Sequence, residues 1–162
     1  MKNNIFTVVT KIGLLSAIVL ATAVISTQAQ SLAYRVTVNI PFDFSIADKT
    51  LPAGKYSIGR ARVNSDDAIL SILDEDGHTK QLRASIPVLT FDPKSKATLV
   101  FHRYGDQYFL YQVWSAGETT GRQFPKSSAE REILRNLAGD AASGKVGQKT
   151  PVETVTVAGV LQ

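Results

Sequence analysis

Apolar and polar residues alternate along the chain from Tyr34 to Ile46. Apolar side chains occupy every second position, and the intervening side chains are polar except at Pro41. A period of two predicts a β-strand with one buried face and one face in water. Because proline has no N–H to donate to a neighbouring strand, we expect an edge position, a bulge or a break into two shorter strands at Pro41.

Turn signals divide the following part of the chain into further short strands. Leu51–Gly54 holds a proline and a glycine in the spacing of a turn, and Asp76-Gly77 is a strong hairpin signal. The strands expected here are residues 55–62, 68–73 and 79–91, separated by breaks at 64–67 and 74–77 and followed by a turn at 92–95. This succession of short strands predicts an all-β domain.

Two strand-like segments, Ala97–Tyr104 and Gln107–Trp114, are separated only by Gly105 and Asp106. A two-residue link that contains glycine suits a primed β-turn, so the two segments are predicted to form a hairpin. The second segment carries large apolar residues on both of its faces, which is typical of a central strand.

One helix is expected to interrupt the β pattern, from Ser127 to Ala138. Ser127 and Glu130 have the spacing of a capping box, in which the hydroxyl accepts from the N–H of Glu130 and the carboxylate accepts from the N–H of Ser127. Three apolar residues share one face of this helix: Ile133, Leu134 and Leu137.

Residues 139–151 are rich in Gly, Ala, Ser and Lys without an apolar period, which predicts a flexible linker. Val152–Val157 is expected to form a last strand that docks back on the sheet, followed by a tail to residue 162. Residues 30–138 are thus predicted to form a mainly antiparallel β-sandwich with one short helix near its C-terminus. A small β-barrel is the alternative.

The first 29 residues have the features of a secretory signal peptide. Lys2 and Lys11 supply positive charge, residues 12–25 form an apolar stretch of 14 residues, and Ala29 ends a small-residue cleavage motif. This stretch is shorter than the roughly 20 residues that span a bilayer, so cleavage after Ala29 is expected in preference to an uncleaved anchor. We predict export to the periplasm or the extracellular space, with no membrane span after cleavage.

Composition narrows the class of protein further. The chain contains 18 basic and 14 acidic residues and no cysteine. Two of the basic residues lie in the expected signal peptide, so the mature chain carries a net charge of only +2, too little to suggest a nucleic-acid partner. Without cysteine the protein has no disulfides, no thiol nucleophile and no lipoprotein anchor. The lack of an N-glycosylation sequon also favours a bacterial product.

Polar and aromatic side chains concentrate around the predicted hairpin turn. They are the candidate binding residues of this chain: His102, Arg103, Tyr104, Asp106, Tyr108 and Trp114. A histidine near an aspartate suggests acid–base or metal chemistry, but adjacent residues in a strand point to opposite faces. We therefore expect the charged members to stabilise the fold by contacts with strands, turn and helix. Their expected partners on the helix are Glu130 and Arg131.

The aromatic rings of the predicted hairpin have two alternative roles. Facing solvent, they would form a platform for sugars or peptides. Facing inward, they would fill the core, and this role is preferred because a domain of this size without disulfides needs large side chains inside.

No catalytic, metal-binding or cofactor-binding motif is complete in this sequence. Asp74–Asp76 resembles the start of a calcium loop, but Ser85 stands where a bidentate glutamate is required, so an acidic turn is expected. His78 and His102 lack the close spacing of a zinc motif. The sequence also lacks a nucleophile elbow and a glycine-rich phosphate loop. We therefore assign no catalytic residue, no metal and no cofactor.

Several segments of the mature chain stand out when taken together: Leu-Pro-Ala-Gly-Lys-Tyr (51–56), Val-Phe-His-Arg-Tyr-Gly-Asp-Gln-Tyr-Phe (100–109), Val-Trp (113–114), Pro-Lys-Ser (125–127) and Glu-Arg (130–131). With them the chain resembles an uncharacterised group of short exported bacterial β-proteins, over about Val36 to Leu137. The resemblance implies a secreted β-domain with a short helix, and it assigns no activity to any residue.

These observations favour a non-enzymatic exported β-domain with a role in binding or in envelope and surface interactions. A protein or a glycan of the envelope is the expected kind of partner. A barrel that carries a small apolar ligand is one alternative, which would show a pocket lined by Phe and Tyr rings. A metal-assisted or acid–base hydrolase is the other, which would show His102 near a carboxylate in a cleft.

Overall fold

A computed structural model of the protein describes residues 35–61, 68–142 and 152–161. The expected signal peptide, the break at 64–67 and the linker residues from 143 to 151 lie outside the described residues. The described part of the chain contains eleven strands and one helix. Their bounds are β1 Arg35–Ile40, β2 Phe44–Ile46, β3 Lys49–Leu51, β4 Gly54–Arg60, β5 Ile69–Leu73, β6 Thr79–Ala84, β7 Ile86–Leu89, β8 Ala97–Tyr104, β9 Gln107–Trp114, β10 Thr120–Gln123, α2 Ser128–Ala142 and β11 Glu153–Leu161.

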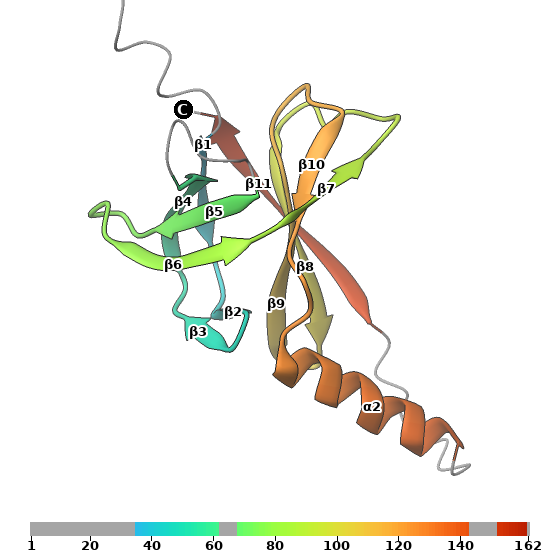
Figure 1. Ribbon diagram of the computed structural model, residues 1–162. Coiled ribbons are helices and arrows are strands. Elements are labelled where there is room, and N and C mark those ends of the chain that lie inside the picture. The colour runs from blue at the N-terminus through green and yellow to red at the C-terminus, as the bar shows by residue number, and fades with distance from the viewer. Residues whose placement is uncertain (1–34, 62–67, 143–151, 162) are drawn as a thin grey trace, which may run out of the picture. The chain divides into compact units, whose positions relative to one another are not determined.

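The strands form one mixed sheet that curls into a half-barrel (Figure 1), which confirms the all-β prediction. Its strand order is β3-β2-β9-β8-β11-β1-β4-β5-β6, and β10 connects β9 to β7. All pairings are antiparallel except that of β2 with β9. β6 and β7 are separated by Ser85 alone, yet β6 pairs with β5 and β7 pairs with β10. These two consecutive strands therefore join two regions of the curled sheet, the one at β5 and the one at β10, that do not pair with each other.

The predicted strand from Tyr34 to Ile46 is broken at Pro41, one of the three outcomes expected there. β1 ends at Ile40 and β2 begins at Phe44. The Asp43 side chain between them accepts a hydrogen bond from the N–H of Ala53 at 2.8 Å. Because that bond ties the break to the turn before β4, the change of direction at proline is held in place.

The β8–β9 hairpin is confirmed, with Tyr104 opposite Gln107 across the turn. Gly105 has a φ of 60°, and Asp106 does not have a positive φ. A positive φ at the first of two turn residues is the pattern of a type II′ turn, which glycine adopts without strain. β9 lies between β8 and β2, as expected of a central strand.

The segment 79–91 differs from the single extended stretch predicted for it. It forms two strands, β6 and β7, which are separated at Ser85 and pair with different neighbours. The N–H of Ser85 donates to the carbonyl of Ala68 at 2.6 Å, and its hydroxyl donates to the same carbonyl at 3.0 Å. These bonds extend the β5–β6 ladder by one position, and beyond Ser85 the chain pairs with β10 as β7.

The helix begins one residue later and ends further along than predicted. Ser127 is its N-cap, since the hydroxyl accepts a hydrogen bond from the N–H of Glu130 at 3.0 Å. The helix continues past Ala138 and Gly139 to Ala142, so the start of the predicted linker is helical. Glycine inside a helix costs only about 1 kcal/mol relative to alanine, which is too little to end a helix by itself.

β11 is longer than the strand predicted at Val152–Val157, and it occupies a central place. It pairs with β8 over seven positions and with β1 at two positions near its end, Val160 and Leu161. Gly159 lies where β11 passes from one neighbour to the other. A Cβ at this position would lie 2.7 Å from the carbonyl oxygen of Thr37, so the close approach of the two backbones requires glycine.

The core fills the inside of the curled sheet. Its largest fully buried side chains come from both halves of the chain: Phe44, Phe101, Ile40, Ile46, Ile58, Ile72, Leu99 and Val36. The Phe44 ring meets the Tyr56 ring edge to face at 5.2 Å and the Phe101 ring at 5.7 Å. Edge-to-face packing of this kind is the preferred geometry of aromatic pairs.

Candidate functional site

The helix α2 is attached to the β8–β9 hairpin by one buried carboxylate. Oε1 of Glu130 lies 2.7 Å from Nδ1 of His102 and accepts a hydrogen bond from the Tyr104 hydroxyl at 3.0 Å. The side chains of His102 and Glu130 are only 12% and 5% exposed. The predicted contact between His102 and the helix is therefore present, and we call His102, Tyr104 and Glu130 the helix-docking trio.

The surroundings of the trio leave little room for a substrate. The His102 ring stacks on Tyr111 with 3.9 Å between ring centroids. The Tyr104 ring meets Phe109 edge to face at 5.8 Å. No member of the trio lines the pocket described below. A histidine held by a carboxylate and covered by rings is placed to anchor the helix.

The capping box is only half formed. Its hydroxyl accepts from the N–H of Glu130 as predicted, but the Glu130 carboxylate contacts the hairpin instead of the backbone of Ser127. A different carboxylate binds the start of the helix, because Oδ1 of Asp48 accepts from the N–H of Ser128 at 3.1 Å. Asp48 follows Ala47, whose φ of 56° is uncommon for a residue other than glycine. Sequence reasoning missed Asp48.

Burial, together with the adjacent Glu130 charge and hydrogen bond, raises the pKa of the Tyr104 hydroxyl well above its usual value near 10. Above pH 10 the unfolded chain therefore loses a proton that the folded chain keeps. Stability from this group is complete below pH 10 and declines as the pH rises further, by up to about 1.4 kcal/mol per pH unit.

We expect the stability advantage of the parent over Tyr104→Phe to shrink between pH 10 and 11, since phenylalanine has no proton to lose. Urea unfolding of both proteins at pH 8, 10 and 11 measures this advantage. A difference that stays constant over this range would contradict the assignment.

Arg103 and Tyr108 lie on the other face of the hairpin from the trio. The guanidinium lies over the Tyr108 ring at 5.5 Å, and Nε donates to the carbonyl of Gly105 at 2.7 Å. Its other end reaches Glu153 of β11 at 3.2 Å. Arg103 therefore connects the hairpin turn to a neighbouring strand, whereas Asp106 remains exposed in the turn.

Two further residues named in the sequence prediction, Arg131 and Trp114, make their hydrogen bonds away from the hairpin turn. Arg131 donates to the carbonyl of Lys126 at 2.5 Å, so its guanidinium is used within the start of the helix. Trp114 is buried, and Nε1 donates to Oε1 of Gln112 at 3.1 Å. The six candidate residues are thus spread over both faces and both ends of the hairpin and form no common site.

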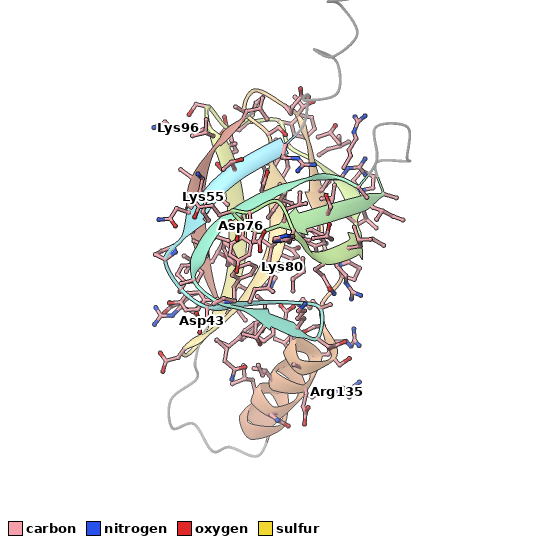
Figure 2. The ribbon with its side chains drawn as sticks, turned by 90° about the vertical axis from the view of Figure 1, so that its left-hand side faces the viewer. Asp43, Lys55, Asp76, Lys80, Lys96 and Arg135 are labelled. Carbon is pink, nitrogen blue, oxygen red and sulfur yellow. The ribbon has the colours of Figure 1, made fainter. Side chains whose placement is uncertain are left out.

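The acidic turn between β5 and β6 brings Asp74, Asp76 and His78 within 4.8 Å of one another. The Asp74 carboxylate already accepts from the ammonium of Lys80 at 2.6 Å and from the N–H of His78 at 2.7 Å. The hydrogen bond from Lys80 is the main reason that the pKa of Asp74 is lowered. The acidic turn is therefore closed by the ion pair between Asp74 and Lys80. Figure 2 labels Asp76 of this turn and Lys80 of β6.

A pocket of about 280 Å³ opens between the two halves of the curled sheet, away from the helix-docking trio. Its walls come from β1, β4 and β5 on one side and from the end of β9, the following loop and β10 on the other. The apolar lining consists of Val36, Ile58, Leu70 and Val113, and the polar lining includes Arg60, Ser115, Glu118, Thr120 and Arg122.

Cross-strand pairing explains why these side chains meet. Arg60 lies directly opposite Leu70, and Arg122 lies directly opposite Val113. Residues directly opposite in a pair of strands point to the same face, so each arginine shares a face with an apolar residue of the pocket. Sequence reasoning missed this site, although Arg60 continues the inward alternation that starts at Tyr56 and passes through Ile58.

The outer edge of the sheet at β6 and β7 carries exposed apolar side chains. The exposed fractions are 55% for Leu82 on β6, 52% for Ile86 and 75% for Leu89 on β7, and 107% for Phe91 just after β7. We call these four residues the apolar edge. Large exposed apolar patches commonly mark surfaces that contact other molecules.

No protein-family model, curated protein or solved structure matches this chain. In the described ranges, no helix is both long and apolar enough to cross a membrane.

Proposed function

We propose that the protein is an exported, non-enzymatic β-domain that acts by binding, and that its small-molecule site is the pocket between β4–β5 and β9–β10. The observation that carries this proposal is the joint lining of one concave site by four aliphatic side chains and two arginines. Ligand sites are commonly apolar hollows of about 300–1,000 Å³ with a few polar groups. A pocket of about 280 Å³ suits a small ligand.

The hydrolase alternative receives no support from the surroundings of His102. Acid–base catalysis needs a histidine that can reach a substrate proton in an accessible site. His102 is instead covered by Tyr111 and held against α2 by Glu130.

A carrier of purely apolar ligands is also disfavoured. That alternative predicts a lining of Phe and Tyr rings, whereas the lining consists of aliphatic, hydroxyl and charged side chains and one glycine. The ligand is therefore expected to be partly polar.

The apolar edge supports the interaction part of the proposal. Leu82, Ile86 and Leu89 are exposed there on β6 and β7, and Phe91 is exposed just after β7. Together with the signal-peptide pattern of residues 1–29, such an edge suits contact with a component of the envelope or cell surface.

Calorimetric titration of the purified protein with octanol and octanoate tests the pocket. We expect saturable binding of at least one of the two compounds. Thr120→Trp places a large ring at the exposed rim of the pocket and should weaken that binding at least tenfold.

The matched control is Thr79→Trp, which changes an exposed threonine on β6 outside the pocket and should bind like the parent. Absence of saturable binding of both compounds, or equal binding by Thr120→Trp and the parent, would overturn the proposed site.

A further inference from the structure

We infer that the partner of the apolar edge is a protein with an extended segment of alternating apolar and acidic residues, which adds a strand to the free edge of β6. This inference rests on the interaction part of the proposed function, because it names the chemistry of that partner. In the described part of the chain β6 pairs only with β5, so its other edge has no neighbouring strand. An unpaired strand edge is a template for an added strand.

The hydrogen bond of Ser85 shows which backbone groups of β6 face the free edge. Its N–H donates to the carbonyl of Ala68, on the side of β5. In an antiparallel pair, residues that bond to the partner strand alternate with residues whose N–H and C=O point away from it. The backbone groups of Leu82 and Ala84 therefore point away from β5, towards the free edge.

The start of this edge, next to the acidic turn, is already covered. The carbonyl of Lys80 accepts from the ammonium of Lys49 at 2.9 Å. A lysine at a sheet edge limits pairing with other chains. The stretch that is open to an added strand therefore begins after Lys80 and contains Leu82 and Ala84.

Apolar side chains cover the outer face of this open stretch. Ala84 lies directly opposite Ile69, and Leu82 lies two residues earlier on the same face. All three side chains are exposed. A partner strand with apolar residues at every second position would extend this surface, because alternate side chains of a strand share a face.

The opposite face of the open stretch carries Arg83. This side chain is half-buried and lies directly opposite the buried Leu70. Within residues 35–61, 68–142 and 152–161, no side chain forms an ion pair or a hydrogen bond with the guanidinium of Arg83. A guanidinium matches the geometry of a carboxylate. The residue of the partner strand next to Arg83 is therefore expected to be Asp or Glu.

A second copy of this chain suits the edge less well than an acidic strand. β6 and β7 contain two basic residues, Lys80 and Arg83, and no acidic residue. Lys80 is bound to Asp74 at 2.6 Å, whereas the charge of Arg83 is not compensated. Antiparallel pairing of two β6 strands around Leu82–Ala84 places two Arg83 side chains opposite or diagonal to each other. Like charges at such positions destabilise a strand pair.

Fluorescence anisotropy of a labelled peptide, acetyl-Ser-Val-Glu-Val-Thr-Val-Ser-amide, tests the inference. We expect saturable binding, and about fivefold weaker binding of the matched peptide with glutamine in place of glutamate. Ala84→Pro removes an N–H on the free edge and should weaken binding at least tenfold while the pairing with β5 is retained. Arg83→Gln should abolish the preference for glutamate. The matched control is Arg135→Gln, an exposed arginine of α2, which should bind both peptides like the parent.

Circular dichroism of each variant checks that the fold is retained. If Ala84→Pro does not fold, Leu82→Asp places a negative charge on the outer face of the same edge and should weaken binding equally. Absence of saturable binding, equal binding by the edge variant and the parent, or equal affinity for the two peptides would overturn the inference. A dimer of the parent that the edge variant converts to a monomer in sedimentation analysis would assign the edge to a second copy and overturn it as well.

The peptide and the pocket are tested separately. Thr120→Trp should bind the peptide like the parent, because Thr120 lines the pocket and lies outside β6. Loss of octanol and octanoate binding therefore overturns the proposed pocket alone, whereas loss of peptide binding overturns the inferred partner alone.

Discussion

Glu130→Ala is expected to lower the free energy of unfolding by about 2–6 kcal/mol. The carboxylate accepts from the Tyr104 hydroxyl at 3.0 Å and lies 2.7 Å from Nδ1 of His102. Alanine leaves both buried groups without this partner, and an unsatisfied buried polar group costs about 1–3 kcal/mol. Urea unfolding at pH 7 measures the loss.

The matched control for this variant is Glu132→Ala. Glu132 is exposed on the same helix, so its removal should change stability by less than about 0.5 kcal/mol. Equal stability of the two variants would show that the trio does not anchor the helix.

If His102→Ala unfolded like the parent but lost octanoate binding, the assignment of a structural role to His102 would be wrong.

Gly159→Ala is expected to destabilise the protein by about 1–3 kcal/mol, the usual cost of adding a methyl group where no space exists. The new Cβ would lie 2.7 Å from the carbonyl oxygen of Thr37 and 3.1 Å from Cγ1 of Val36. The nearest of these atoms belongs to the backbone of β1, which cannot move without loosening the pairing of β1 with β4 and β11. Thermal and urea unfolding measure the effect.

Gly139→Ala provides a matched control in the helix. The Cβ that alanine would add at Gly139 has no atom within 4 Å, apart from its two chain neighbours and the nearby backbone of the helix itself. Replacing a helical glycine by alanine commonly stabilises a protein by up to about 1 kcal/mol. A Gly159→Ala protein as stable as the parent would contradict the close approach of β11 to β1.

Local signals in the sequence were sufficient for most strands, the hairpin and the start of the helix. Gly105 and Asp106 predicted the turn because only a few turn types join two strands through two residues. Ser127 predicted the N-cap because its hydroxyl acts on an N–H three residues away. In each case the residues that carry the signal are also the residues that form the structure.

Pairing partners depended on residues far away in the sequence. The strand predicted from 79 to 91 divides at Ser85 because its first part pairs with β5 and its second part with β10. β11 packs closely against β1 at Gly159, where a Cβ would lie 2.7 Å from the carbonyl oxygen of Thr37. The Glu130 carboxylate leaves its capping role because two buried donors of the hairpin lie next to it. An alternation pattern identifies a strand and its buried face, but it does not identify the neighbour.

The sequence by itself determined the all-β class and the position of the hairpin, because each depends on spacing along the chain. It also named Glu130 among the expected partners of the polar cluster, and the structure shows which member of that cluster, His102, contacts it. Only the tertiary structure decided the place of β11, the length of α2 and the existence of the pocket. Arg60 and Arg122 belong to strands that do not pair with each other. They line one pocket because the sheet curls, and that curvature results from the pairing of all its strands together.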